Sequence, residues 1–299
     1  MNKKQVLNFF QMFLLCAVCF PFIGSGAQPE KKPATTDTLQ FQQIRSATVV
    51  VTIGGIRFLV DPWFADKDSV PPLEGSPNPT LRSPVFELPF PIKRILDVDA
   101  VIVTHLHFDH FDQKAIDSIP KNMPIFAQDE IDAAEIRKHG FKDVRSLKYK
   151  GVEFKRVQLF KTGGHHGMPG VVEPAYEAGG VRAEACGIVF RHPKVAKTLY
   201  IAGDSIWCDW IENTIHQYKP DVIVLNTAEA TLKQTGKIIM GLDDIREVLK
   251  AAPDAIIIAS HMDNVSHSML WRKDIRKFVR ENSLESRILV PEDGEVYEF

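Results

Sequence analysis

Three histidines and an aspartate fall within six residues, in the run HLHFDH from His105 to His110. Imidazole nitrogens and carboxylate oxygens are common ligands of zinc and similar divalent ions. In extended backbone, side chains two residues apart point the same way, so His105 and His107 can converge on one ion. A turn after them would direct Asp109 and His110 to a second ion. This dense spacing predicts a metal site rather than scattered histidines.

The chemistry expected of such a site is hydrolysis. A water molecule shared by two cations loses a proton near neutral pH, and the ions polarise the carbonyl or phosphoryl oxygen under attack. Asp109 could accept or relay a proton as well as bind metal. His267, at the start of a predicted helix, could donate to a leaving group, and the alternatives are a helix cap or a solvated side chain.

Short apolar runs precede four polar residues that could contribute to the site: Asp61, His105, Asp204 and His261. Buried sheets often collect functional residues at the carboxyl ends of their strands. Helical patterns alternate with these runs and cover residues 112–118, 129–139, 207–218, 242–251 and 267–280. Strands that alternate with helices predict an α/β fold.

Two segments before the histidine run have distinct signatures. Residues 47–53 and 56–60 are β-branched runs separated by Gly54 and Gly55, which predicts a hairpin with a tight turn. Residues 62–91 hold eight prolines, which excludes a long helix or a central strand. The segment is either a functional loop or a solvated excursion. Its aromatic residues could line the entrance of a substrate site or pin the loop to the core: Trp63, Phe64 and Phe86.

Composition limits the class of protein. The chain has 299 residues, of which 44% are hydrophobic and 25% charged, as expected for a water-soluble globular protein with one large domain. We place this domain at residues 39–299. The formal net charge of -2 gives no reason to expect a nucleic-acid partner. A small-molecule substrate is expected, and the sequence leaves a homo-oligomer open.

The first residues resemble an export signal. Lys3 and Lys4 precede an apolar stretch, residues 6–23, and small residues follow it. We therefore predict a signal peptide at residues 1–27, a linker at residues 28–38 and a periplasmic or secreted protein without a stable membrane span. A retained membrane anchor is the alternative.

Two cysteines remain after the predicted cleavage, Cys186 and Cys208. An exported location would allow them to pair. Two buried, unpaired thiols are the alternative.

The run from Thr104 to His110 resembles the T-H-x-H-x-D-H signature of the metallo-β-lactamase superfamily. Four further segments are similar to its other motifs, so the resemblance covers residues 39 to 299: residues 58–63, 164–167, 203–207 and 260–262. Among the branches of the superfamily, the chain most resembles proteins similar to the ascorbate-phosphate lactonases. The resemblance implies a four-layer αβ/βα sandwich with a binuclear site between two sheets.

The resemblance also implies the ligands of two divalent ions, expected to be zinc, with manganese or iron as alternatives. The first ion would be held by His105, His107 and a histidine of the 163–167 loop. The second would be held by Asp109, His110 and His261. Asp204 would bridge the two ions, and Asp61 would orient a ligand. We prefer His166 over His165 in the loop because the branch that the chain resembles tends to place this ligand just before a glycine, as in His166-Gly167.

The expected function is hydrolysis of a small ester, lactone, amide or phosphodiester. A di-iron redox protein and a non-catalytic metal-binding protein of the same fold are the alternatives. Three other histidines are expected to be structural: His139, His192 and His216. Trp207 and Trp210 could either wall the site or pack in the core.

Overall fold

The computed structural model describes residues 37–299. The predicted signal peptide at residues 1–27 lies outside the described residues, as does the linker up to residue 36. Within the described part, no helix is both long and apolar enough to cross a membrane.

Two seven-stranded sheets form the centre of the described chain. The first has the order β16-β1-β2-β3-β4-β5-β6, with β1 Leu39–Arg45, β2 Thr48–Ile53, β3 Ile56–Val60, β4 Ala100–Val103, β5 Ile125–Ala127, β6 Val144–Ser146 and β16 Val296–Glu298. The second has the order β15-β14-β11-β10-β9-β8-β7, with β7 Val152–Phe154, β8 Val157–Thr162, β9 Gly187–His192, β10 Val195–Ile201, β11 Val222–Asn226, β14 Ile256–Ser260 and β15 Ile288–Leu289. A separate small ribbon pairs β12 Thr231–Leu232 with β13 Gly236–Lys237.

Each sheet combines antiparallel and parallel strands. In the first sheet β1, β2 and β3 are antiparallel neighbours, whereas β3, β4, β5 and β6 run parallel. In the second, β7 to β10 are antiparallel, and β10, β11, β14 and β15 run parallel. The carboxyl ends of the parallel strands therefore meet at one edge of each sheet.

The helices of the described chain are α1 Ile92–Ile95, α2 Gln113–Ser118, α3 Glu130–Lys138, α4 Val172–Ala178, α5 Asp209–Tyr218, α6 Leu242–Ala251 and α7 Arg272–Glu281. Four of the five predicted helices are confirmed within two residues at each end. The prediction was wrong at the start of the last helix, because α7 begins at Arg272 and leaves His267 in the preceding loop. α1 and α4 were not predicted.

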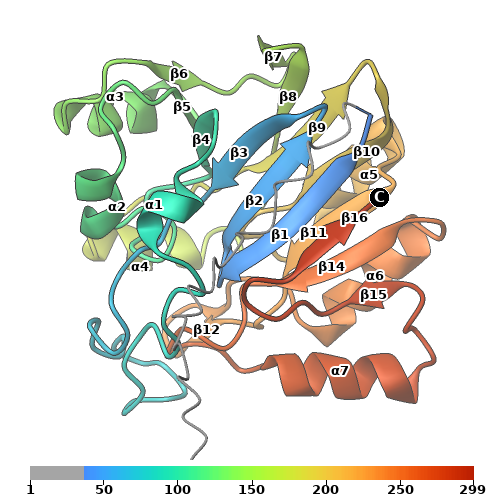
Figure 1. Cartoon of the computed structure of the whole chain (residues 1–299). Helices are drawn as coiled ribbons and strands as arrows, with labels where there is room; N and C mark the ends of the chain where they lie inside the picture. Colours follow the sequence, from blue (N-terminus) through green and yellow to red (C-terminus); the bar gives the residue numbers. More distant parts are fainter. Residues whose placement is uncertain (1–36) are drawn as a thin grey trace, which may run out of the picture. The chain divides into compact units, whose positions relative to one another are not determined.

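Three groups of buried apolar side chains separate four layers. One lies between the sheets and includes Phe58 and Phe190. Another covers the first sheet beneath α2 and α3 and includes Ile136. The third covers the second sheet beneath α5, α6 and α7 and includes Ile245 and Phe278. This is the predicted four-layer αβ/βα sandwich, with helices outside both sheets (Figure 1).

The predicted hairpin is confirmed, since Ile53 pairs with Ile56 and both Gly54 and Gly55 have positive φ. Residues 62–91 form a loop without a helix, interrupted by a bridge between Val70 and Ser83.

The proline-rich loop is anchored rather than solvated. Trp63 and Phe64 are fully buried, whereas Phe86 is 47% exposed, so the first two pin the loop to the core. Asn78 Nδ2 donates to the backbone oxygens of Ser266 and Ser268, at 2.8 Å each. The loop therefore holds the segment that contains His267.

Cys186 and Cys208 are free thiols in the structure, so they do not form a disulfide. Cys186 is buried between the sheets, and Cys208 is half-buried. Burial raises the pKa of the Cys186 thiol, which keeps it protonated and weakly reactive near neutral pH.

Candidate metal centre

The histidine run follows β4 without a break. His105, Asp109 and His110 are buried, and His107 is half-buried. The backbone N–H groups of His110 and Phe111 both donate to the carbonyl oxygen of His107, at 3.0 Å. These bonds form the turn expected after the first two histidines, and the turn redirects the chain so that Asp109 and His110 face the same space.

The other predicted site residues follow the ends of strands from both sheets: Asp61 after β3, His166 after β8, Asp204 after β10 and His261 after β14. Asp61 and His261 have φ values of 49° and 60°. Left-handed backbone at residues other than glycine costs roughly 1–3 kcal/mol and persists where the surroundings fix it.

Ligand-bearing side chains converge in three overlapping groups, and within each group the potential ligand atoms lie within 4.8 Å of one another. The groups are His105, His107 and His166; His105, His110 and Asp204; and Asp109, His110 and His261. Every residue predicted to ligate metal belongs to at least one group, and Asp204 lies between the histidines of both expected sites. His165, the alternative to His166 in the loop, belongs to none of these groups of described residues.

The contact between His107 and His166 favours the binding of a cation between the two rings. His107 Nε2 donates to the carbonyl oxygen of Arg182, and His166 Nδ1 donates to that of Ile238, both at 2.9 Å. The other nitrogens, His107 Nδ1 and His166 Nε2, face each other at 3.2 Å. In neutral rings both carry lone pairs, which repel. Nitrogens that share a tetrahedral zinc ion at 2.0–2.1 Å lie about 3.3 Å apart, close to this spacing.

His105 supplies a second sign of a cation. Its Nε2 atom is buried and has no hydrogen-bond partner among the described residues. A buried nitrogen without a partner costs free energy unless something binds it. Asp204 Oδ2 is 3.9 Å away, a separation that an ion between the two atoms would bridge. The residues present therefore fit divalent ions.

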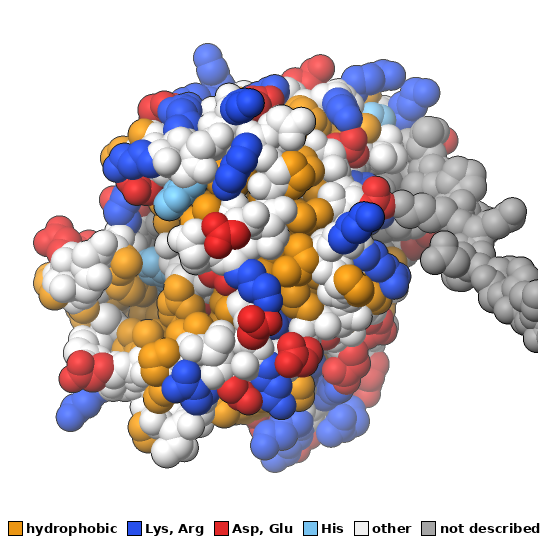
Figure 2. All heavy atoms as spheres, turned by 60° about the vertical axis from the view of Figure 1, so that its left-hand side comes forward, with side chains coloured by type: hydrophobic (Ala, Val, Ile, Leu, Met, Phe, Trp, Pro, Cys, Tyr) orange, Lys and Arg blue, Asp and Glu red, His pale blue; other side chains and the backbone are white. Residues whose placement is uncertain are grey.

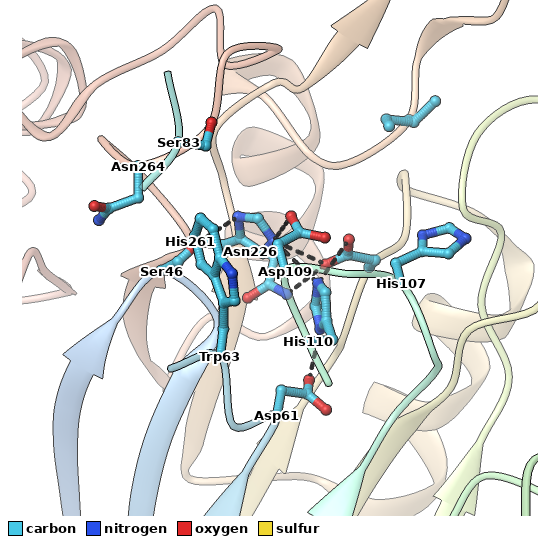
Figure 3. Close-up of polar contacts among 12 residues, drawn as sticks. Ser46, Asp61, Trp63, Ser83, His107, Asp109, His110, Asn226, His261 and Asn264 are labelled. Atoms are coloured by element: carbon cyan, nitrogen blue, oxygen red, sulfur yellow. Dashed lines mark hydrogen bonds and ion pairs between the residues drawn. The ribbon is translucent and has the colours of Figure 1, made fainter. Parts of the chain in front are cut away.

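Asp61 orients His110. Its carboxylate accepts from the backbone nitrogen and the hydroxyl of Thr104, both at 2.7 Å, and from His110 Nδ1 at 2.9 Å. This arrangement leaves His110 Nε2 directed at the site, where it lies 3.1 Å from His261 Nε2. Figure 3 shows His110 between Asp61 on one side and His261 on the other.

Two further side chains orient ligands. Asn226, at the end of β11, donates to Asp204 Oδ1 at 2.6 Å, and Asp204 Oδ2 then faces the histidines. Ser46 Oγ lies 3.2 Å from His261 Nδ1, so His261 Nε2 points into the site. Such outer contacts fix ring orientation and are typical of metal sites.

The electrostatics of the site combine neutral imidazoles with charged carboxylates. Burial lowers the pKa of His107 to about 4. Burial would raise the pKa of Asp204, but His110 and His261 hold it well below its usual value. Burial also opposes charge on His110, yet Asp204 and Asp61 outweigh it and raise the pKa of His110. A proton on His110 therefore balances the carboxylates, and a cation could replace it.

A cavity of about 620 Å³ opens onto the site and is lined by His107, Asp109, His166 and Asp204. Its other walls are largely apolar, from Leu73, Leu106, Phe108, Phe111, Ile116, Tyr176, Val181, Leu232 and Ile238. Lys and Arg are absent from its described lining. Figure 2 shows hydrophobic side chains gathered on the face that carries α2 and α4.

His267 lines the cavity although it is not on a helix. It is 5% exposed, and burial lowers its pKa to about 4. Its Nδ1 atom has no partner in the described chain. His267 is therefore neither a helix cap nor a solvated side chain, and it lines the same cavity as several of the predicted ligands.

The remaining candidates lie outside the ligand groups. His139 ends α3 at the cavity rim, His192 packs near Gly54, and His216 is exposed. Trp207 packs against the helix-covered core of the second sheet. Trp210 is 46% exposed and stacks on Tyr149 at a ring distance of 6.0 Å.

Sequence reasoning missed four residues that shape the site: Ser46, Thr104, Tyr176 and Asn226. Thr104 belongs to the recognised motif and could have been found from it. Asn226 ends an apolar run, the same signal that identified Asp204. Ser46 and Tyr176 have no comparable signal in the sequence.

Known proteins resemble this chain over most of its length. A family model described as a beta-lactamase superfamily domain matches residues 56–262. UPF0173 protein YddR of Bacillus subtilis (strain 168) is 44% identical over 262 residues, which cover 87% of this chain and 100% of the relative.

Two crystal structures agree with this fold, each with a TM-score of 0.82 over 87% of this chain and 99% of the other. One is an isothiocyanate hydrolase from Delia radicum gut bacteria, at 42% identity. The other is a possible metal-dependent hydrolase from Veillonella parvula DSM 2008, at 40% identity.

Proposed function

The chain belongs to the metallo-β-lactamase superfamily, and from this membership we propose that it is a metal-dependent hydrolase of small, uncharged substrates. The main support for the proposal is one cavity that is lined both by apolar side chains and by histidines and aspartates of the three groups. Two divalent ions held there would supply an activated water near neutral pH and polarise the bond under attack. Zinc suits the imidazole-rich ligands best.

The lining of the cavity narrows the range of expected substrates. Enzymes that transfer or cleave phosphoryl groups commonly place Arg or Lys beside the phosphate oxygens. The described lining offers no such cation, and its large apolar area favours a neutral molecule. Of the expected substrates, esters, lactones and amides therefore fit better than phosphodiesters.

Isothiocyanates, R–N=C=S, fit the same description and are the substrates named for one relative at 42% identity. They are uncharged, have an electrophilic central carbon and carry an apolar R group. Water oxygen adds to that carbon, and the C–N bond then breaks. Nitrogen takes up the protons, so the products are the amine R–NH₂ and carbonyl sulfide. We propose isothiocyanates as the first class to test.

Different side chains of the cavity have different proposed roles in hydrolysis. Asp109, with His267 nearby in the cavity lining, could accept or relay the proton of the attacking water. His267 is neutral at pH 7, since burial lowers its pKa to about 4, and its imidazole could hydrogen-bond the leaving group from the cavity wall. The apolar walls exclude bulk water and hold the R group.

The test pairs elemental analysis with a substrate panel. Purified protein is expected to hold close to two metal ions per chain and to hydrolyse benzyl isothiocyanate, phenyl acetate or a lactone in preference to bis(4-nitrophenyl) phosphate. His107→Ala should lose metal and nearly all turnover. His216→Ala is the matched control, because His216 is exposed and joins no ligand group. Full activity in His107→Ala would overturn the proposal, and optical spectra would reveal a di-iron centre.

We propose further that the protein is exported and acts in the periplasm or outside the cell. The basic residues, apolar stretch and small residues of the amino terminus support this. Mass spectrometry of protein from the producing cells should find a chain that begins at Gln28. An intact amino terminus in the membrane fraction would favour the anchor instead.

A further inference from the structure

Tyr176 lines the cavity beside two of the predicted ligand histidines, His107 and His166. It lies on α4, is 8% exposed and lines the cavity. Its ring centre is 5.1 Å from that of His107 and 5.4 Å from that of His166. The phenol ring therefore packs against the imidazoles of the expected first metal site.

The hydroxyl oxygen of Tyr176 is buried and has no hydrogen-bond partner among the described residues. A buried polar group without a partner destabilises the folded protein. Packing against the histidines needs only the ring, so a phenylalanine would avoid this cost. The hydroxyl is thus unexplained by the folded chain alone.

We propose that Tyr176 is a substrate-binding residue whose hydroxyl donates a hydrogen bond to an acceptor atom at the reacting end of an uncharged substrate. This inference rests on the proposed hydrolytic function and adds a recognition rule to it. The acceptor would approach the hydroxyl from the cavity, and the apolar part of the substrate would lie against Leu106, Phe108 and Ile116, which line the same cavity. A compound without an acceptor gains nothing from the hydroxyl.

Two variants and two probes separate this role from simple packing. Tyr176→Phe removes only the hydroxyl. Tyr200→Phe is the matched control, because Tyr200 is fully buried on β10 and does not line the cavity. The probes are 2-phenylacetamide, which has a carbonyl acceptor, and ethylbenzene, which has the ring alone. Their dissociation constants are measured by NMR titration of the zinc-loaded proteins, whose zinc content is checked first.

The Kd of 2-phenylacetamide should rise about 10-fold in Tyr176→Phe, whereas that of ethylbenzene should stay unchanged. Both values should match wild type in Tyr200→Phe, and kcat/KM for the best substrate should fall about 10-fold in Tyr176→Phe alone. Wild-type affinity of Tyr176→Phe for the amide, or equal loss for both probes, would overturn the assignment. If nothing in the substrate panel is hydrolysed but the amide-specific loss remains, the proposed function fails and the binding role of Tyr176 stands.

Discussion

Asp61 acts on the site without belonging to a ligand group. It fixes the amino-terminal end of the histidine run through Thr104 and one ring of that run through His110. A carboxylate behind an imidazole sets the ring orientation and makes the opposite nitrogen a better ligand. Asp61 should therefore tune metal binding at the site that contains His110.

Replacement of Asp61 by asparagine should weaken metal binding about 10- to 100-fold at that site, because the amide cannot accept all three bonds. Competition with a chromophoric chelator measures the affinity. Asp66→Asn is the control, since Asp66 is exposed and pairs with Lys114 on the surface. Equal affinity in both variants would show that Asp61 has no such role.

The site residues differ in how far the sequence could reveal them. The three histidines and the aspartate of the histidine run lie within six consecutive residues, so their spacing alone indicated a metal site. Asp204 and His261 were found because each follows an apolar run. Tyr176 contacts His107 and His166 only after α4 packs against them, and no local pattern encodes that contact.

At the scale of elements, the junction between β14 and α7 carries the largest difference from expectation. The predicted helix began at His267, but the apolar positions with helical spacing begin only at Trp271. Asp274 Oδ2 accepts from the backbone nitrogen of Trp271 at 3.0 Å, which caps the helix there. The preceding loop is shaped by Asp263, whose φ is 68°. Long-range contacts, rather than helical propensity, hold His267 in the cavity wall.

Arg272 stabilises this junction through ion pairs that are nearly buried. It bonds to Asp263 at 3.1 Å and also to Asp293. Arg272→Met should lower the free energy of unfolding by about 3 to 5 kcal/mol, because two carboxylates lose their partner away from water. Urea denaturation measures the change. Lys273→Met, at the exposed neighbouring position, should change stability little, and a similar small effect of Arg272→Met would contradict the argument.

At the scale of the whole molecule, the predicted ligands come from both sheets. β3 and β4 carry Asp61 and the histidine run, whereas β10 and β14 carry Asp204 and His261. The α/β class followed from alternating strands and helices. The pairing of strands into two separate sheets did not, because strand order depends on contacts between distant segments. The four-layer arrangement was expected only through the family resemblance.

Removal of metal should destabilise the protein and make it sensitive to acid. Burial lowers the pKa of His107 and of His267 to about 4, below the value near 6.5 in an unfolded chain. Between pH 6.5 and 4 the unfolded state therefore binds more protons, and the free energy of unfolding falls as the pH falls. Burial also lowers the pKa of His105 and of His166, so the raised pKa of His110 acts in the opposite direction as one group against four.

Thermal unfolding with and without a chelator, at pH 7 and pH 5, tests this expectation. Chelation should lower Tm at pH 7, since an ion that binds only the folded state stabilises it. The chelated protein should have a lower Tm at pH 5 than at pH 7. A Tm that is equal or higher at pH 5 would show that His110 dominates.

The pairing of β16 with β1 protects one edge of the first sheet. Gln40 faces Glu298 across these strands, so residues near opposite ends of the described chain are neighbours. Without β16, β1 would present unpaired backbone groups along that edge, and other extended chains can pair with such groups. Deletion of β16 should therefore make the protein prone to aggregate.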